Sequence, residues 1–522
     1  MVEDQPACAA KGFALNMHFS NEQPLIIRAD AIGQMGTGHV MRCFALAQAW
    51  LNTVGDVIFL TACHSQALLE RLRESKFNVH VIDHPYPDDR DWDSAKSILT
   101  EYPNAWVVLD GYHLDEVYQK RVKEAGNRVL VIDDTAHLQH YHADIILNQN
   151  LHAEHLPYSH EPDTKLLLGT CYTLLRKEFH PWANWERQVS EVAHHVLVSF
   201  GGTDTENQTL KVVRALQEMD TLTFEAVVVV GTSNPHIHEI ETLVRESRVP
   251  IQLIQDADDM AELMAWADVA ITSAGTTTWE LAFMGLPALV IATAENQTDV
   301  AVEAERLGAA QNLGWYYGLS EFEISEALRV LFLDSQRRQM MSKQGRTAVD
   351  GHGAGRVCSA LAENGLYLRS ASRIDCQLLW RWANDPLTRS MSINTDPIDF
   401  KDHLSWFEKK LKSEDATIMI LERDSAPVGQ IRFDLDVLGC AEIDVYIAEP
   451  YRGLSLGTYL LNEGARRYFL ISGERVKSLI GHVRTDNLAS RRAFEGAGFG
   501  FEGNEVLQDV SLMRYVRSKG GS

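Results

Sequence analysis

The chain has 522 residues, enough for about three domains. Hydrophobic residues make up 45% of the sequence and charged residues 23%, so large packed cores are expected and extensive disorder is excluded. The formal net charge of −24 argues against a nucleic-acid backbone or an anionic membrane surface as a partner. A small anionic ligand remains compatible with this charge, because a loop or helix end can be locally positive.

The cysteine pattern and the N-terminus indicate the compartment. The seven cysteines are scattered without a Cys-x-x-Cys pair, so neither a disulfide framework nor a zinc site is indicated. Residues 1–23 read as a polar leader that lacks the features of a signal peptide, and no apolar run is long enough to span a membrane. We therefore expect a cytoplasmic protein without membrane insertion.

A glycine-rich loop follows the first predicted strand, Leu25–Ile27, and leads into a predicted helix, Val40–Leu51. The N–H groups at a helix start lack partners and carry partial positive charge, so they suit a diphosphate or a developing anion. His39 stands at this start, where the same field disfavours imidazolium, so His39 could accept a proton. The alternative is that the glycines form a tight turn and His39 caps the helix. The glycines are Gly33, Gly36 and Gly38.

Short apolar strands alternate with helices from here to about residue 187. Many of these strands end in Asp, Asn or Gly, as expected for a parallel sheet with ligand loops at its carboxyl edge. For most of the Asp residues we prefer a helix cap or turn role. Tyr112 is expected to face a ligand, because it lies just past a strand end. The predicted strands are Val57–Leu60, Val79–Ile82, Trp106–Leu109, Val129–Ile132 and Ile145–Leu147.

A second alternating region begins with the strand Val196–Phe200 and the turn Gly201–Asp204. The hydroxyl-rich loop Thr272–Glu280 opens a helix and can offer N–H and O–H donors to phosphate. Glu280 could accept hydrogen bonds from ribose, although acidic residues are also common near helix starts. Two Rossmann-like domains, 24–187 and 188–364, would thus face each other across a cleft. The remaining strands predicted here are Val227–Val230, Ile251–Ile254, Val269–Ile271 and Ala288–Ile291.

A series of short motifs runs in order through this region. They are Arg28-Ala-Asp30, Gly38-His39-Val-Met-Arg42, Asp110-Gly-Tyr112, Ile132-Asp-Asp134, Asp144 to Asn148, Leu174 to Phe179, Phe200 to Asn207, Ser273 to Glu280 and Glu295-Asn-Gln297. With these motifs the segment from about 24 to 360 resembles the UDP-sugar hydrolases of pseudaminic acid biosynthesis, which act on UDP-2,4-diacetamido-2,4,6-trideoxy-β-L-altrose. That family is similar in turn to the two-domain, metal-independent glycosyltransferases of the GT-B type.

The resemblance implies roles for individual residues. His39 would be the base that activates water, and Tyr112 would line the same site. Helix N-termini would stabilise the departing diphosphate, so no metal is expected. A GT-B glycosyltransferase is the alternative, distinguished by a second substrate in place of water. The residues expected to bind the UDP-sugar are Gly38, Gly202, Asp204, Asn207, Ser273, Thr276, Glu280 and Asn296.

The regular alternation of short strands and helices ends after the glycine-rich bend Asp350–Gly355. A helix, Arg356–Asn364, is expected to close the second Rossmann-like domain, and a further domain spans 365–517. That domain reads as an α+β unit whose antiparallel meander precedes a strand-to-helix turn. Its predicted elements are a strand from Leu366, helices Cys376–Ala383 and Asp399–Leu411, strands Thr417–Leu421, Gly429–Phe433, Ala441–Ile447 and Ser478–Val483, and a last helix from Asn487.

The turn Arg452–Gly457 corresponds to an R/Q-x-x-G-x-G/A loop, and Asn487 and Ser490 form an Asn-x-x-Ser pattern. On these motifs the domain resembles the GNAT N-acetyltransferases, and more narrowly the one that acetylates the 4-amino group of the UDP-sugar before the hydrolase step. The resemblance implies acetyl-CoA as co-substrate. The residues expected to bind it are Arg452, Gly453, Ser455, Gly457, Thr458, Asn487 and Ser490.

Two residues depart from the GNAT pattern. Ser455 replaces a glycine, and it can supply the same backbone amide if its φ is negative. Phe494 replaces the tyrosine that protonates the departing thiolate, so water, Tyr459 or Ser490 would have to help. Glu442 and Asp444 share one face of a strand and could relay a proton, but an ordinary polar strand position is the preferred interpretation.

The sequence thus predicts an α/β protein in which a GT-B-like pair of Rossmann-like domains precedes an α+β GNAT domain. We expect a bifunctional enzyme that acetylates an amino UDP-sugar and then removes UDP from the product. Its partners would be the UDP-sugar and acetyl-CoA, and not a nucleic acid. The alternative is a GT-B glycosyltransferase that carries a non-catalytic GNAT-like module.

Overall fold

The computed structural model describes residues 23–32, 36–53, 55–219, 222–232, 234–362, 365–392, 394–507 and 510–519. The predicted leader up to residue 22, and Gly33 in the first glycine loop, lie outside the described residues. The chain divides into two compact units. The larger comprises Gln23–Gln377 and Glu422–Ala426, and the smaller includes Leu378–Leu421 and Pro427–Ser522.

The first sheet of the larger unit is parallel, with the strand order β3-β2-β1-β4-β5-β6-β7. The central strands β1 and β4 are buried along their whole length, which explains why they read as unbroken apolar runs. The edge strand β7, half of which is exposed, was not predicted. The strands are β1 Leu25–Ala29, β2 Val57–Thr61, β3 Asn78–Val81, β4 Trp106–Asp110, β5 Arg128–Ile132, β6 Ile145–Asn148 and β7 Lys165–Leu168.

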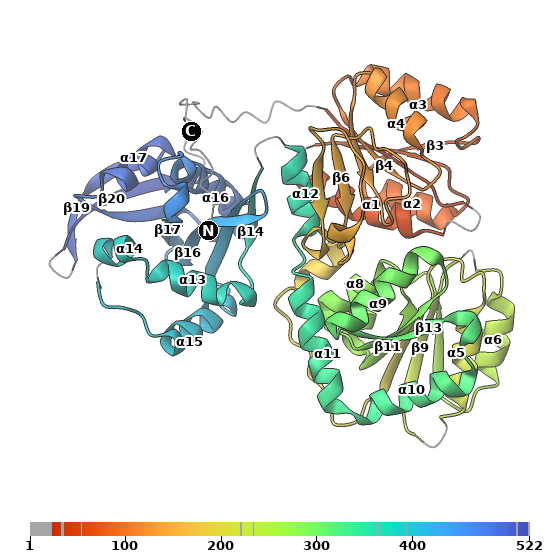
Figure 1. The fold of residues 1–522 in the computed structure, drawn as a ribbon. Helices are drawn as coiled ribbons and strands as arrows, with labels where there is room; N and C mark the ends of the chain where they lie inside the picture. Colours follow the sequence, from red (N-terminus) through yellow and green to blue (C-terminus); the bar gives the residue numbers. More distant parts are fainter. Residues whose placement is uncertain are drawn as a thin grey trace, which may run out of the picture. The chain divides into compact units, whose positions relative to one another are not determined.

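Helices cover both faces of this sheet (Figure 1). Side chains of β1 that alternate along the strand pack into two cores: Leu25 and Ile27 lie with α1 and α2, and Ile26 lies with α3 and α4. The helices are α1 Gly38–Thr53, α2 Gln66–Glu74, α3 Asp89–Glu101 and α4 Glu116–Glu124.

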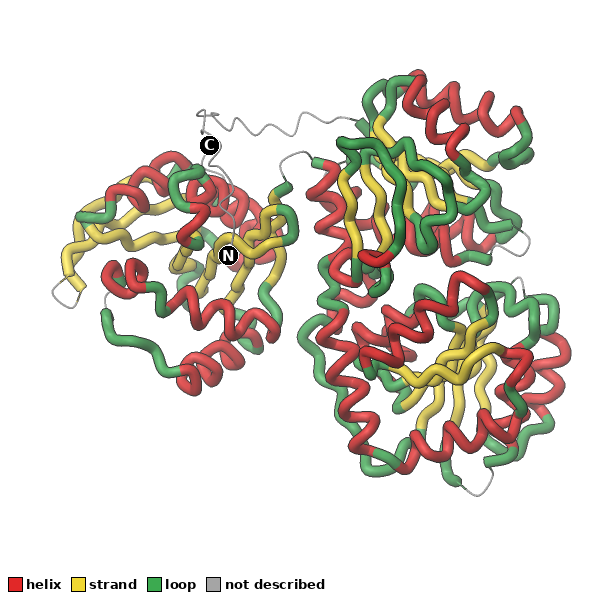
Figure 2. Tube along the Cα trace, in the orientation of Figure 1, coloured by secondary structure: helices red, strands yellow, loops and turns green. Residues whose placement is uncertain are grey.

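The second sheet is also parallel, with the order β10-β9-β8-β11-β12-β13. Figure 2 shows its strands in yellow between red helices. The strands are β8 His195–Ser199, β9 Glu225–Val230, β10 Ile251–Gln255, β11 Val269–Ser273, β12 Ala288–Ala292 and β13 Ala310–Trp315. The helices are α5 Gln208–Gln217, α6 Ile237–Arg245, α7 Met260–Trp266, α8 Thr277–Met284, α9 Thr298–Leu307, α10 Glu321–Leu333 and α11 Ser335–Ala348.

The late helix α12, Gly353–Leu361, differs from its predicted placement. Its apolar residues Ala354, Val357 and Leu361 are buried in the core formed by β1 and α1, so this helix completes the first half and not the second. The indole N–H of Trp106 donates to the carbonyl of Leu361 at 2.9 Å and holds the helix there. The sequence gives the amphipathic pattern of the helix but not the partner that its apolar face meets.

The third sheet has the order β14-β15-β16-β17-β18-β20-β19. As predicted, β16 and β17 are antiparallel, whereas β17 and β18 are parallel. The strands are β14 Leu366–Ser370, β15 Ala416–Arg423, β16 Ala426–Leu435, β17 Cys440–Ile447, β18 Ser478–Arg484, β19 Gly500–Leu507 and β20 Val510–Ser518. The helices are α13 Cys376–Ala383, α14 Pro386–Met391, α15 Phe400–Leu411, α16 Leu456–Ser472 and α17 Leu488–Gly496.

Two parallel α/β halves and an α+β domain are therefore present, in the predicted order. The domain boundaries at residues 187 and 364 remain predictions. Across the described helices, none combines the length and the apolar character that crossing a bilayer requires.

Candidate functional site

His39 lies in the first turn of α1, immediately after the loop that leaves β1. Its side chain is mostly buried, and Nδ1 lies 2.5 Å from Oδ1 of Asp110. Asp110 is the last residue of β4, which pairs with β1 in the sheet. The carboxyl ends of two adjacent parallel strands therefore bring an imidazole and a carboxylate together.

Asp110 is an ionised carboxylate. Burial alone would raise its pKa, but the charge of Arg42 and the proximity of His39 hold that pKa below its usual range. Arg42 lies three residues after His39 on the same face of α1, and it donates to both oxygens of Asp110 at 2.7 Å. An ionised carboxylate only accepts hydrogen bonds, so Nδ1 of His39 must donate. The lone pair of Nε2 is then available to accept a proton.

Arg42 also reaches a second buried carboxylate, Asp134, with Nη1 at 2.7 and 2.9 Å from its two oxygens. Asn150 donates to the same carboxylate at 2.9 Å. The cap or turn role that we preferred for most Asp residues is wrong for Asp110 and Asp134, which bind a side chain of another element. The feature of the sequence that could have indicated this ion-pair network was Arg42, a cation one helical turn after His39.

Tyr112 links this network to the second half of the larger unit. Its ring meets the ring of His39 edge-on, with centroids 5.4 Å apart. Its hydroxyl donates to Asp134 at 2.9 Å and accepts from the amide of Asn296 at 3.0 Å. Burial and the charge of Asp134 raise the pKa of Tyr112 far above its usual range, so it remains a phenol that donates. His39 and Tyr112, which the resemblance placed in one site, therefore lie together, and Asn296 from the expected UDP-binding set lies beside them.

The glycine loops of the two halves also lie against each other. A Cβ added to Gly202, just after β8, would lie 2.8 Å from Oγ1 of Thr37 at the start of α1. A Cβ on Gly231, after β9, would lie 2.3 Å from the carbonyl oxygen of Gly202. The missing side chains allow this close approach of backbone to backbone. The carboxyl edges of both sheets thus contribute to one site.

Three residues predicted to bind UDP already form hydrogen bonds with neighbouring protein groups. Asp204 accepts from the backbone N–H groups of Gln208 and Thr209 at 2.9 and 2.8 Å, and so caps α5. Asn207 donates to Glu239 at 3.3 Å. Glu280, in the first turn of α8, accepts from Arg176 at 3.0 Å.

The UDP contacts of these residues stay predictions, as do those of Gly38, Ser273 and Thr276. Arg176 was not among the residues that the sequence predicted to bind the UDP-sugar. It is a buried guanidinium beside Glu280, and its signal was its place in the motif Leu174 to Phe179.

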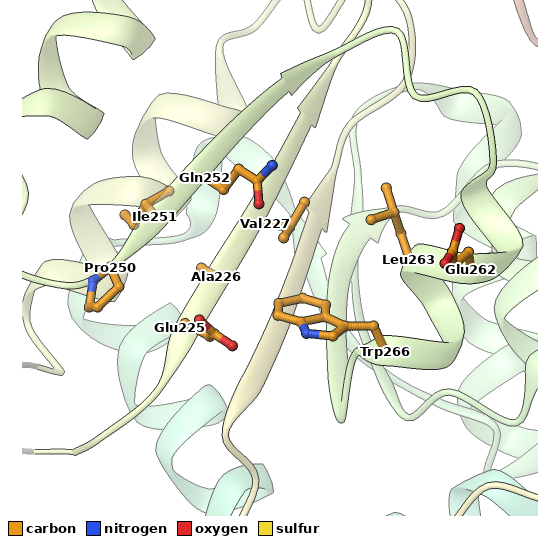
Figure 3. Close-up of a pocket in the computed structure, with 9 residues that line it drawn as sticks. All are labelled: Glu225, Ala226, Val227, Pro250, Ile251, Gln252, Glu262, Leu263 and Trp266. Carbon is orange, nitrogen blue, oxygen red and sulfur yellow. The ribbon is translucent and has the colours of Figure 1, made fainter.

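A hollow of about 510 Å³ lies elsewhere, at the amino ends of β9 and β10 (Figure 3). Val227, Ile251 and Trp266 are among its lining residues. Ligands of open parallel sheets bind at the carboxyl ends of the strands. This hollow is therefore not the site formed by His39 and Tyr112.

The candidate acetyl-CoA site lies between β17 and α16. Strand β17 pairs with β18 from Cys440–Ile443 to Ser478–Gly481, and both strands continue beyond the paired residues. The loop Arg452–Gly457 follows β17 and ends at the first turn of α16, where unpaired backbone N–H groups of a helix start favour an anionic ligand.

Two residues of this loop behave differently from expectation. Ser455 has φ of +60°, so the condition of a negative φ is not met, and the serine occupies a conformation that favours glycine. Arg452 donates to the carbonyl of Ile447 and to Asp385, each at 2.9 Å, and thus holds the loop in place.

The substituted Phe494 is a core residue. It is 2% exposed and packs against Phe499 and Tyr515. A Cβ on Gly481 would lie 2.1 Å from its ring, so the ring fills the space that the glycine leaves. Burial raises the pKa of Tyr459 to about 12, which keeps that phenol protonated as a possible donor.

The Asn-x-x-Ser pattern acts as a helix cap, because Asn487 accepts from the backbone N–H of Ser490 at 3.0 Å. The acetyl-CoA contacts of Asn487, Ser490, Gly453, Gly457 and Thr458 remain predictions.

Comparison with known proteins is consistent with this division. Residues 195–353 match the model of the glycosyltransferase family 28 C-terminal domain, and residues 377–501 match the acetyltransferase (GNAT) family. An uncharacterized protein of Methanocaldococcus jannaschii is 24% identical over 94% of this chain and 100% of its own length. The spore coat polysaccharide biosynthesis protein SpsG of Bacillus subtilis is 25% identical over 65% of this chain and 97% of its own.

A third relative is the pseudaminic acid cytidylyltransferase and UDP-2,4-diacetamido-2,4,6-trideoxy-beta-L-altropyranose hydrolase of Helicobacter pylori. It is 25% identical over 39% of this chain and 37% of its own length. The predicted fold class is confirmed: a GT-B-like pair of Rossmann-like domains is followed by a domain that matches the acetyltransferase (GNAT) family, which is consistent with the expected co-substrate acetyl-CoA.

Proposed function

We propose that the larger unit hydrolyses a UDP-sugar, releasing UDP and the free sugar, and that the smaller unit acetylates an amino group of the same class of UDP-sugar. The observation that carries the first activity is the His39–Asp110 pair beside the two glycine loops. The names of the relatives support the substrate class, because one acts in polysaccharide biosynthesis and another includes a UDP-sugar hydrolase. The substrate would be the UDP-linked 2,4-diacetamido-2,4,6-trideoxy-β-L-altrose of that hydrolase.

His39 would act as the general base. Its Nε2 takes a proton from water as the water oxygen forms a bond to the anomeric carbon. The bond between that carbon and the diphosphate oxygen breaks, and UDP leaves with the electron pair. Asp110 keeps the imidazole in the required tautomer and stabilises the imidazolium that forms. The developing charge on UDP would be met by N–H groups at the starts of α1 and α8 and by the Ser273 and Thr276 hydroxyls.

A glycosyltransferase is the second candidate, because residues 195–353 match a glycosyltransferase domain. In that case His39 would deprotonate a sugar hydroxyl in place of water. Release of UDP without any added acceptor separates the two activities.

The acetyl transfer would precede hydrolysis. The amine of the UDP-sugar attacks the thioester carbonyl, the carbon–sulfur bond breaks, and the nitrogen releases a proton to solvent as the amide forms. Coenzyme A leaves as a thiolate that takes up a proton. Phe494 cannot supply that proton, so we assign this role to Tyr459 or water. A coenzyme A thiol resembles cysteine, with a pKa of about 8.5, so the thiolate needs only modest help to leave.

The first prediction concerns His39. His39→Asn should lower the rate of UDP release about 10²- to 10⁴-fold, because the general base is lost. Thermal melting should change little, because asparagine still suits a helix start. His238→Asn is the matched control, since the side chain of His238 is 92% exposed on α6. Near-normal turnover in a folded His39→Asn protein would contradict the assignment.

The second prediction concerns the nucleotide. Glu280→Ala and Asn296→Ala should each weaken UDP binding by about 1–3 kcal/mol, the cost of a lost buried hydrogen bond. Titration calorimetry with UDP alone measures this directly. The control is Glu303→Ala, which removes a surface ion pair with Arg306 on α9. Unchanged UDP affinity in both site variants would place the nucleotide elsewhere.

The third prediction concerns the acetyltransferase loop. Ser455→Gly should stabilise the loop by about 1 kcal/mol, because glycine adopts the positive φ without steric cost. We expect tighter acetyl-CoA binding and a higher melting temperature of the domain. Ser455→Ala should show neither gain, since alanine keeps the strained Cβ. If Ser455→Gly instead weakens acetyl-CoA binding, the serine hydroxyl itself is a ligand group.

A further inference from the structure

Two short extended segments of the larger unit run side by side outside the site described above. Tyr141, after β5, and His160, before β7, form a parallel bridge, and the N–H of Tyr141 donates to the carbonyl of Ser159 at 2.8 Å. Alternate side chains of an extended chain point to the same side. This register therefore places His140 opposite Ser159 and His142 opposite Glu161, all on one face.

The side chains follow this register. Nδ1 of His142 lies 2.8 Å from Oε1 of Glu161, and Nε2 of His140 lies 3.4 Å from the same oxygen. One ligand atom of each of the three residues lies within 4.8 Å of those of the other two. The hydroxyl of Ser159 is 2.9 Å from Nδ1 of His140, which turns Nε2 of that ring toward the cluster.

We propose that His140, His142 and Glu161 form a binding site for a divalent transition-metal ion such as Zn²⁺. Two imidazoles and one carboxylate are a ligand set that Zn²⁺ accepts, with water in the fourth position. Zinc–ligand bonds of about 2.1 Å in tetrahedral geometry separate the ligand atoms by about 3.4 Å. The distance from Glu161 to His140 already has this value, and the distance from Glu161 to His142 needs to widen by about 0.6 Å to reach it.

The hydrogen bond between His140 and Ser159 would also orient the His140 ring for metal binding. A ligating histidine is usually held by a partner on its other ring nitrogen, which fixes the ring orientation and the tautomer. Ser159 supplies this partner before any metal is present. The sequence did not indicate the site, because Glu161 lies 19 residues from His142 and short-range spacing does not connect them.

The ion would restrain a loop that supports the proposed active site. Tyr141, between the two histidines, is fully buried, and its hydroxyl donates to Asp133 at 2.8 Å. Asp133 directly precedes Asp134, the carboxylate that holds Arg42 and Tyr112. The metal would therefore act as a clip on the segment between β5 and β6, and it supplies no group to the hydrolysis.

The test uses untagged full-length protein freed of metal by a chelator and then dialysed. Calorimetric titration with Zn²⁺ alone should show about one equivalent bound, and Zn²⁺ should raise the melting temperature. His142→Ala and Glu161→Gln should each weaken binding by more than about tenfold and abolish this rise. His160→Ala is the matched control: it removes a neighbouring imidazole on the opposite face, and binding should be retained.

Co²⁺ provides a second readout, because its visible absorption reports the coordination number and should show a tetrahedral spectrum in the wild type only. If Zn²⁺ fails to bind, or binds equally to His142→Ala and the wild type, the three residues form an ion-paired surface cluster and no metal site. That result would leave the proposed hydrolase untouched, because UDP release is measured separately.

Discussion

The buried charges around Arg42 are the constraint on which the active site depends. Asp110 ends β4 and Asp134 lies two residues after β5, and the guanidinium of Arg42 neutralises both in the interior. Leaving one partner of such a network unpaired costs about 3–5 kcal/mol, so the side chains have little freedom. The same network fixes the tautomer of His39 and holds the hydroxyl of Tyr112 in place. An interaction needed for folding thus also aligns the proposed base.

The parallel topology explains why the site can draw on both halves of the larger unit. Every functional loop leaves the carboxyl edge of a sheet, and the glycines at positions 202 and 231 let these loops approach each other without side chains. Asn296 then connects the second half directly to Tyr112. A ligand between the loops would meet helix N-termini from both halves and the proposed base from the first.

Local patterns in the sequence predicted most of the strands and the helix starts, because apolar runs and glycine turns are properties of neighbouring residues. They did not predict where α12 packs, which depends on a face formed by β1 and α1. They also missed the pairing of Arg42 with Asp134, 92 residues away, since long-range ion pairs leave no periodic signal. The positive φ of Ser455 was unexpected for a related reason: the loop imposes the conformation, and serine only tolerates it.

The central claim is that water attacks the anomeric carbon of a UDP-sugar at His39. The most direct test is to incubate the protein with the UDP-linked diacetamido sugar in water labelled with heavy oxygen, without any acceptor, and to locate the label by mass spectrometry. The account predicts stoichiometric UDP and free sugar, with the label on the anomeric hydroxyl and none in UDP. Label in the phosphate, or no UDP release until a sugar acceptor is added, would contradict it.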